Sequence, residues 1–264
     1  MTTAITAQKP STFNMLTEGR AIMEFGAAGI TMPLLISGPN GDGHPVIVIP
    51  GFLASDMSTG LLRTFLKLKG YKAEGWKLGR NLGTHITGGK NVVSDAVLNR
   101  VLEMHVRYDT KVSIVGWSLG GIFAREIARV IPDCIRQVVS LGSPFNGPKG
   151  AAPMVAKMFK IINGDMAKRE PQAMERMLKP PPVPSSAIYS RTDGVAHWQA
   201  CRDDWADPSR QSENIEVRGS HMGLGHNPQV LWIVANRLAQ KQGEWHPFRE
   251  KAMHKLLYPN PNRA

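Results

Sequence analysis

Short apolar runs alternate with segments of helical spacing through the middle of the chain. The runs are rich in β-branched residues and most end at Gly or Pro, as buried strands do. They lie at 46–49, 111–115, 135–141, 187–190 and 215–218. The segments between them repeat apolar residues at helical period, which is typical of helices that cover a sheet. The alternation predicts an α/β chain with a doubly wound, mostly parallel sheet.

The first strand and the last helix have the clearest boundaries. Residues 46–49 are β-branched throughout, which is typical of a strand buried on both faces, so this strand should lie inside the sheet. A helix should follow it, with Ser58 as its cap and Gly70 as its stop. The last helix should begin at Asn227-Pro228, because Asn caps helices and Pro suits the first helical position.

The regular alternation breaks between residues 147 and 184, where Met, Lys and Pro accumulate and no β-branched strand appears. We interpret 147–184 as an inserted cap or lid. The other boundaries follow from it: a helical N-terminal extension packed on the core over 1–44, the α/β core over 45–146 and 185–240, and a basic C-terminal tail over 241–264.

Composition excludes several classes of protein. The chain has 264 residues, of which 42% are hydrophobic and 20% charged, as in an ordinary globular protein. Its two cysteines, Cys134 and Cys201, form no CxxC pair, which excludes a zinc ribbon, thioredoxin-type chemistry and a disulfide-stapled scaffold. We expect neither a metal nor an organic cofactor.

The net charge of +11 would attract nucleic acid or anionic lipid. No run of five Lys and Arg residues occurs and the basic residues are spread between segments, so a solvated surface explains them. We expect no nucleic-acid partner. Peripheral contact with an anionic membrane stays open, because cap and tail lysines could snorkel toward lipid headgroups.

The most apolar stretch, 21–37, does not predict a membrane span. It is interrupted by Glu24, Gly26, Gly29 and Pro33 and is shorter than the roughly 20 residues that a spanning helix needs. The N-terminus lacks the uninterrupted apolar core of a signal peptide. We therefore expect a cytoplasmic protein, in which this stretch is a packed helix or an oligomer contact.

Candidate chemistry begins with Gly116-Trp117-Ser118-Leu119-Gly120, which lies between a predicted strand and a predicted helix. A G-x-S-x-G turn in this context holds a nucleophilic serine above the sheet on a strained backbone. Gly116 and Gly120 let backbone segments approach each other closely. We therefore identify Ser118 as the candidate nucleophile.

A serine nucleophile needs a base, and the base needs an anionic group to orient it. Asp193 and His221 follow two later predicted strands, in the chain order Ser, acid, His. His226 is the rival base, and Asp203 and Asp204 are the rival acids. Three other histidines precede the serine and so have the wrong order: His44, His85 and His105.

An acyl-transfer site also needs two donors for the oxyanion. The Leu119 N–H, at the start of a helix, is one candidate. The Phe52 N–H, after the sharp Pro50-Gly51 turn, is the second, with Leu53 as the alternative.

Four segments together resemble lipase-like α/β hydrolases, in the order oxyanion, nucleophile, acid and base. They are Val-Ile-Val-Ile-Pro-Gly-Phe, Gly-Trp-Ser-Leu-Gly-Gly, Ser-Arg-Thr-Asp-Gly and Gly-Ser-His-Met-Gly, and the resemblance covers about residues 45 to 240. It implies an α/β-hydrolase sheet. The oxyanion turn departs from the pattern, since it begins Pro-Gly where many lipases have His-Gly.

Together these features predict a serine hydrolase that cleaves carboxylic esters of small molecules or lipids through an acyl-enzyme. An acyltransferase, thioesterase or amidase would use the same triad, and a catalytically silent ligand-binding scaffold is a further alternative. The cap could supply an apolar wall over Ser118, although the same side chains could simply pack on the sheet. The candidates for this wall are Trp117, Met154, Met158 and Phe159.

Overall fold

The computed structural model describes residues 9–86, 92–146, 151–164, 176–248 and 258–259. A single six-stranded sheet forms its centre, in the order β2-β1-β3-β4-β5-β6 with every neighbouring pair parallel. The predicted α/β class and parallel sheet are confirmed. The strands are β1 Pro45–Ile49, β2 Lys72–Gly75, β3 Val112–Trp117, β4 Ile135–Leu141, β5 Ser185–Ser190 and β6 Ser212–Val217.

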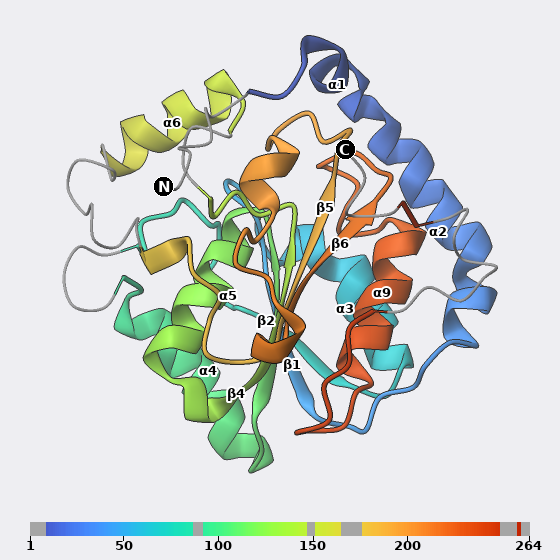
Figure 1. The fold of residues 1–264 in the computed structure, drawn as a ribbon, viewed down its shortest axis with the longest axis vertical. Coiled ribbons are helices and arrows are strands. Elements are labelled where there is room, and N and C mark those ends of the chain that lie inside the picture. The colour runs from blue at the N-terminus through green and yellow to red at the C-terminus, as the bar shows by residue number, and fades with distance from the viewer. Residues whose placement is uncertain (1–8, 87–91, 147–150, 165–175, 249–257, 260–264) are drawn as a thin grey trace.

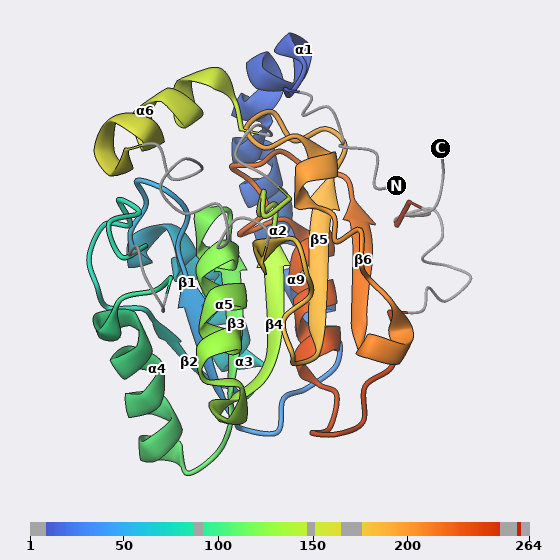
Figure 2. The ribbon, with the colours of Figure 1, turned by 60° about the vertical axis from the view of Figure 1, so that its left-hand side comes forward.

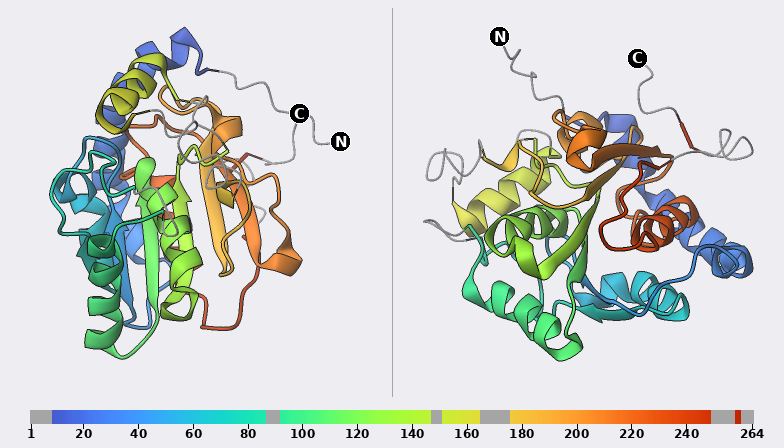
Figure 3. Two further views of the ribbon diagram at one scale, coloured as in Figure 1. Left: turned by 90° about the vertical axis from the view of Figure 1, so that its left-hand side faces the viewer. Right: turned by 60° about the horizontal axis from the view of Figure 1, so that its bottom comes forward.

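Helices cover both faces of the sheet (Figure 1, Figure 2 and Figure 3). One face carries α2 (Ala21–Ile36), α3 (Gly60–Leu68) and α9 (Pro228–Leu238), and the other carries α4 (Asp95–Tyr108) and α5 (Leu119–Val130). Each layer encloses its own apolar core, so the sheet is buried on both sides. The shorter helices are α1 Thr12–Leu16, η1 Thr17–Arg20, η2 Asp56–Thr59, η3 Pro132–Cys134, α6 Pro153–Asn163, η5 Trp198–Cys201 and η6 Pro208–Arg210.

Strand β1 is buried at all five positions and lies between β2 and β3, as its apolar sequence predicts. The cap of α9 is also confirmed, since the Asn227 side chain accepts the Gln229 N–H at 2.9 Å. The expected cap at Ser58 is wrong. Ser58 lies inside η2 and its hydroxyl donates to the Ser55 carbonyl, so α3 begins after Thr59.

The N-terminal segment is helical, as its sequence predicts. Ser11 accepts the Asn14 N–H, and α1, η1 and α2 then form one helical run over Thr12–Ile36. The run has 25 residues and is long and apolar enough, by length and composition alone, to cross a membrane. The apolar stretch itself forms α2, in which the glycines and Pro33 are included, and the expectation that it does not span a membrane stays a prediction.

The cap and the tail are described only in part. Helix α6 belongs to the predicted cap, and residues 147–150 and 165–175 of that cap lie outside the described residues, as do 249–257 and 260–264 of the predicted tail. An antiparallel bridge between Ala151 and Ala196 joins the start of the described cap to the loop that follows β5. The cap boundaries therefore stay a prediction.

Candidate active site

The strand β3 ends at Trp117, and α5 begins at Leu119, so a single residue makes the turn. That residue is Ser118, whose backbone has φ 54° and ψ −120°, a combination that residues other than glycine rarely adopt. The flanking glycines explain how the turn closes. A Cβ at Gly116 would overlap the Gly120 carbonyl, and a Cβ at Gly120 would overlap the Ile49 carbonyl.

Two neighbouring strands hold this turn in place. The Ser118 N–H donates to the Leu141 carbonyl at the end of β4. On the other side, Gly51, just after β1, packs against the turn, and a Cβ on Gly51 would lie 3.1 Å from the Ser118 Cβ. The serine therefore lies at the carboxyl edge of the sheet, beside the predicted oxyanion turn.

The loops after β5 and β6 bring Asp193 and His221 together. The His221 Nδ1 lies 2.6 Å from the Asp193 Oδ2, and both side chains are buried. The other carboxylate oxygen of Asp193 accepts the N–H groups of Val195 and Ala196, which fixes its orientation. With Nδ1 donating to Asp193, the imidazole keeps Nε2 as the acceptor, which is the tautomer that a general base needs.

Nearby negative charge raises the pKa of His221. Burial lowers the pKa of His221, but the charge and hydrogen bond of Asp193 and the charge of Glu18 outweigh burial, so the pKa lies above its ordinary value of 6.5. Within the described part of the chain, Ser118 Oγ and His221 are not hydrogen-bonded to each other. Such contacts are often long before substrate binds.

The rival residues lie elsewhere. His226 bonds through Nε2 to the Ala21 carbonyl of α2. Asp203 pairs with Arg125 at 2.9 Å, and the side chains of Asp203 and Arg125 are both buried. Asp204 is exposed and accepts from the Asn146 amide. The geometry therefore favours Asp193 and His221 over these alternatives.

A second Ser-His-Asp chain lies near the start of β1. His44 contacts Asp42 at 2.5 Å through Nδ1 and Ser113 at 2.8 Å through Nε2. Burial lowers the pKa of His44, and Ser113 is fully buried within β3, where no substrate carbonyl could reach it. This chain is a packing feature, and a search by side-chain type alone would mistake it for a catalytic triad.

The predicted oxyanion donors flank Ser118. Leu119 is the first residue of α5, so its N–H has no acceptor within the helix. Leu53, the alternative oxyanion donor, has φ 63°. Its N–H already donates to the Asn81 carbonyl at 2.7 Å. Phe52 is thereby the available N–H of this turn.

The buried Asn81 holds that turn, and our sequence analysis missed it. Its side-chain amide donates to the Pro50 carbonyl at 2.8 Å, and its own N–H donates to the Ala54 carbonyl. Asn81 lies within a glycine-rich loop that has no strand or helix pattern, so no sequence pattern marked it.

Of the predicted pocket residues, Phe159 contacts the oxyanion turn. Its ring meets the Phe52 ring edge-on at 5.4 Å between centroids, so α6 rests on the oxyanion turn. Met154 is 70% exposed, and Met158 is half-exposed. Trp117 is instead buried in the core below the site, because strand alternation turns it away from Ser118.

A cavity of about 580 Å³ lies at the opposite end of the sheet. Its lining includes Val183 and Gln211, which precede β5 and β6, and Trp205. It therefore lies away from the candidate triad. Among the described residues, no group of three or more His, Cys, Asp or Glu side chains could hold a metal ion.

Comparisons with known proteins add the fold relationship. No family model matches the sequence. No curated protein matches it either. Among solved structures, the chain is similar to Bacillus licheniformis lipase BlEst2 in its mature form, with TM-score 0.54 and 14% identity, over 77% of this chain and 94% of that chain.

Two further structures show the same likeness. One belongs to LipS and LipT, two metagenome-derived lipolytic enzymes, with TM-score 0.53 and 14% identity over 75% of this chain and 93% of that chain. The other is Aspergillus fumigatus lipase B, with TM-score 0.53 and 15% identity over 78% of this chain. The chain spans 55% of the length of the Aspergillus protein. At such identities the likeness shows a shared fold.

Proposed function

We propose that this chain, which has the α/β-hydrolase fold, is a serine hydrolase that cleaves carboxylic esters through an acyl-enzyme. One observation carries the proposal. Ser118 stands on a positive-φ turn at the start of α5, and the buried His221–Asp193 pair lies on loops at the same edge of the sheet. Burial of such a pair costs desolvation energy, and buried acid–base pairs of this kind occur often at functional sites.

In the proposed first step, the Ser118 hydroxyl attacks the ester carbonyl while His221 Nε2 takes its proton. Asp193 keeps the imidazole oriented and stabilises the imidazolium that forms. The Phe52 and Leu119 N–H groups donate to the oxyanion, each removal of such a donor costing about 3–4 kcal/mol. His221 then gives its proton to the leaving alcohol.

In the second step, water replaces the alcohol. His221 takes a proton from the water, which attacks the acyl-enzyme carbonyl, and returns it to Ser118 as the acid product leaves. The raised pKa of His221 fits a base that must hold a proton between the two transfers.

The test is covalent labelling by a fluorophosphonate together with hydrolysis of short p-nitrophenyl esters. We expect both with the wild-type chain and neither with Ser118→Ala. Ser209→Ala is the matched control, because Ser209 is exposed on η6 before β6 and should leave both unchanged. Ester hydrolysis that persists in Ser118→Ala would refute the proposal.

The same triad would serve acyl transfer to an amine, thiol or alcohol acceptor, or the hydrolysis of a thioester or amide. Product analysis with competing acceptors separates these reactions. A silent ligand-binding scaffold would take no fluorophosphonate label at Ser118.

We also propose that the helical run 12–36 contacts an anionic lipid surface, with the cytoplasm as the proposed location of the protein. Its polar side chains Glu18, Arg20 and Glu24 face the protein, while large apolar side chains face outward. The net charge of +11 complements anionic lipid and repels a second copy of the chain. The outward apolar side chains are Phe13, Leu16, Ile22, Met23, Phe25, Ile30 and Leu34.

The proposed lipid-facing surface adjoins the candidate site. Figures 1 and 2 show α1 and α6 at the same end of the molecule, near the carboxyl ends of the strands. Helix α6 also exposes Met154 and Ile161 beside the exposed Lys157, an arrangement that suits a lipid interface. Docking through this end would present Ser118 to substrate dissolved in the lipid.

A further inference from the structure

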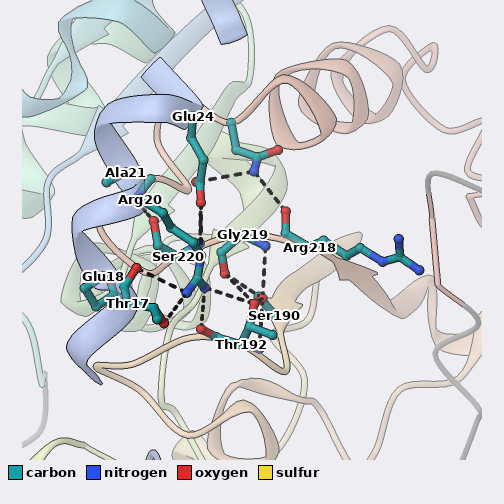
Figure 4. A network of polar contacts seen from close by, with 12 residues as sticks. Thr17, Glu18, Arg20, Ala21, Glu24, Ser190, Thr192, Arg218, Gly219 and Ser220 are labelled. Carbon is teal, nitrogen blue, oxygen red and sulfur yellow. Dashed lines mark hydrogen bonds and ion pairs between the residues drawn. The ribbon is translucent and has the colours of Figure 1, made fainter. Parts of the chain in front are cut away.

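The helical run 12–36 lies across the two loops that carry the candidate acid and base (Figure 4). Its polar side chains bond to both loops, although more than 150 residues separate them in sequence. None of these contacts was anticipated from the sequence, in which the segment has only the pattern of an apolar helix.

Glu18 makes the central contacts. Its Oε1 accepts the Gly194 N–H at 2.7 Å and the His221 N–H at 2.9 Å, and its Oε2 accepts the Met222 N–H at 2.9 Å. Gly194 directly follows Asp193. A single carboxylate therefore bonds the residue after the candidate acid and the candidate base itself, through three backbone donors.

Two neighbours on the same run fix it in place. Arg20 donates to the Thr192 carbonyl at 2.6 Å and to its hydroxyl at 3.0 Å. Glu24 accepts the Ser220 N–H at 2.8 Å and pairs with Arg20 at 3.5 Å. Charged side chains that follow Glu18 along the run thus also attach it to both loops (Figure 4).

We propose that Glu18 is a positioning residue, which holds the acid loop and the base loop in register so that His221 stays aligned between Asp193 and Ser118. The proposal rests on the proposed serine-hydrolase function. It goes beyond that function, because it assigns a role in the reaction to a carboxylate outside the triad and outside the α/β core.

The other contacts between the two loops lie nearer the strands. The Ser190 hydroxyl, at the end of β5, donates to the Gly219 carbonyl at 2.7 Å, and Thr192 donates to the same carbonyl at 3.1 Å. Beyond them, the loops are joined by the Asp193–His221 pair and by Glu18. Glu18 thus joins the two loops directly beside the Asp193–His221 pair, where alignment of the imidazole is decided.

Glu18 also acts on His221 through its charge. The charged groups nearest the imidazole are Asp193, on the loop after β5, and Glu18, on the helical run. Arg20 and Glu24 lie further away, where they bond neighbouring residues of the two loops. Removal of the Glu18 charge should therefore lower the pKa of His221. A residue that merely fastened the helix would not move that pKa.

The experiment compares Glu18→Gln with Glu24→Gln in the full chain. Gln keeps the size of the side chain, but its NH2 group would face one of the three N–H donors, and its charge is lost. Glu24→Gln removes a carboxylate of the same run that bonds the base loop directly and reaches the acid loop only through its pair with Arg20.

For Glu18→Gln we expect kcat on a short p-nitrophenyl ester to fall about tenfold or more, with KM within about twofold of wild type. The acid limb of the kcat/KM profile should move to lower pH. In Glu24→Gln that limb should stay in place and kcat should fall less. The His221 pKa is measured directly by NMR titration of labelled histidine, and Tm is recorded for every variant.

An unchanged kcat and an unchanged His221 pKa in Glu18→Gln, with or without a fall in Tm, would overturn the proposal. Equal effects of the two variants on the His221 pKa would overturn it as well. Failure of the proposed function has a different signature: the wild-type chain would neither hydrolyse esters nor take the fluorophosphonate label, while the NMR titration would still report whether Glu18 acts on His221.

Discussion

The indole nitrogen of Trp117 donates a 3.1 Å hydrogen bond to the carbonyl oxygen of His221. The bond joins the residue before the candidate nucleophile to the candidate base, across 104 positions of sequence. It attaches the base loop to the end of β3, so the loop after β6 cannot move away from Ser118 without leaving a buried N–H unpaired. Trp117 therefore helps to hold the candidate base close to the candidate nucleophile.

The two candidate bases, His221 and His226, make different contacts, so their substitution should have different effects on the reaction. We expect His221→Ala to lower kcat for p-nitrophenyl ester hydrolysis by about 10³-fold or more, because the serine loses its proton acceptor. His226→Ala should change kcat by less than about threefold, because His226 bonds to the Ala21 carbonyl and faces α2. Steady-state kinetics of both variants, with circular dichroism to check folding, decide the matter. A larger loss in His226→Ala would exchange the two roles.

Asn81 gives a prediction about the oxyanion turn. Asn81→Ala removes the hydrogen bond to the Pro50 carbonyl and leaves that buried acceptor unpaired. We expect kcat to fall by about tenfold or more, through misplacement of the Phe52 N–H, while KM changes little. Tm should fall as well, by an amount that corresponds to about 1–3 kcal/mol.

A control for Asn81 comes from the same loop region. Arg80→Met removes a surface hydrogen bond to the Leu53 carbonyl and leaves the amide of Asn81 in place. Kinetics close to wild type are expected for it. An equal fall in kcat in both variants would attribute the effect to the loop as a whole.

Glu74 gives a prediction about stability at low pH. Burial raises the pKa of Glu74, but hydrogen bonds from Lys77, Arg100 and Tyr108 outweigh it and lower the pKa to about 2. Because the folded-state pKa lies below the unfolded value, the carboxylate stabilises the fold above about pH 4.5, and this contribution is lost as the pH falls toward 2.

Glu74→Gln should therefore lower the free energy of unfolding at pH 7 by about 2–3 kcal/mol, with a difference from wild type that shrinks below about pH 4. Urea unfolding at several pH values measures it. Glu103→Gln is the matched control, since Glu103 pairs with Arg100 and Arg107 but is exposed, and its effect should stay below about 1 kcal/mol. A constant difference at all pH values would contradict the assignment to Glu74.

The sheet could be predicted from the sequence because it depends on local patterns, and local patterns also marked the candidate triad residues. β-Branched runs predict strands wherever the sheet is buried on both faces, as at β1 and β4. Ser118 could be found because the backbone at that point requires glycine on either side. Asp193 and His221 followed from the loops at strand ends, and the structure brings their side chains together.

The supporting residues could not be predicted, because each acts through a contact with distant backbone. Asn81 bonds a carbonyl 31 positions away, and Glu18 bonds N–H groups 176 to 204 positions away. Backbone donors and acceptors leave no mark in sequence. Glu24 also counted as an interruption of an apolar segment, whereas Glu18 and Glu24 form the inward, bonded face of the helical run.

The outward face of the same run gives the last prediction, on lipid binding. We expect the wild-type chain to co-sediment with phosphatidylcholine vesicles that contain about 30% phosphatidylglycerol, more than with phosphatidylcholine alone, and less at high salt. Ile22 and Ile30 are 80% and 84% exposed, so the double variant Ile22→Asn/Ile30→Asn should preserve Tm. It should weaken vesicle binding about tenfold or more, because each apolar side chain that inserts into lipid contributes about 1.5–3 kcal/mol when fully buried. Val106→Asn is the control, because Val106 is 77% exposed on α4 and lies apart from this face. A dimer in analytical ultracentrifugation that the double substitution dissociates, without vesicle binding, would assign the face to a second copy of the chain.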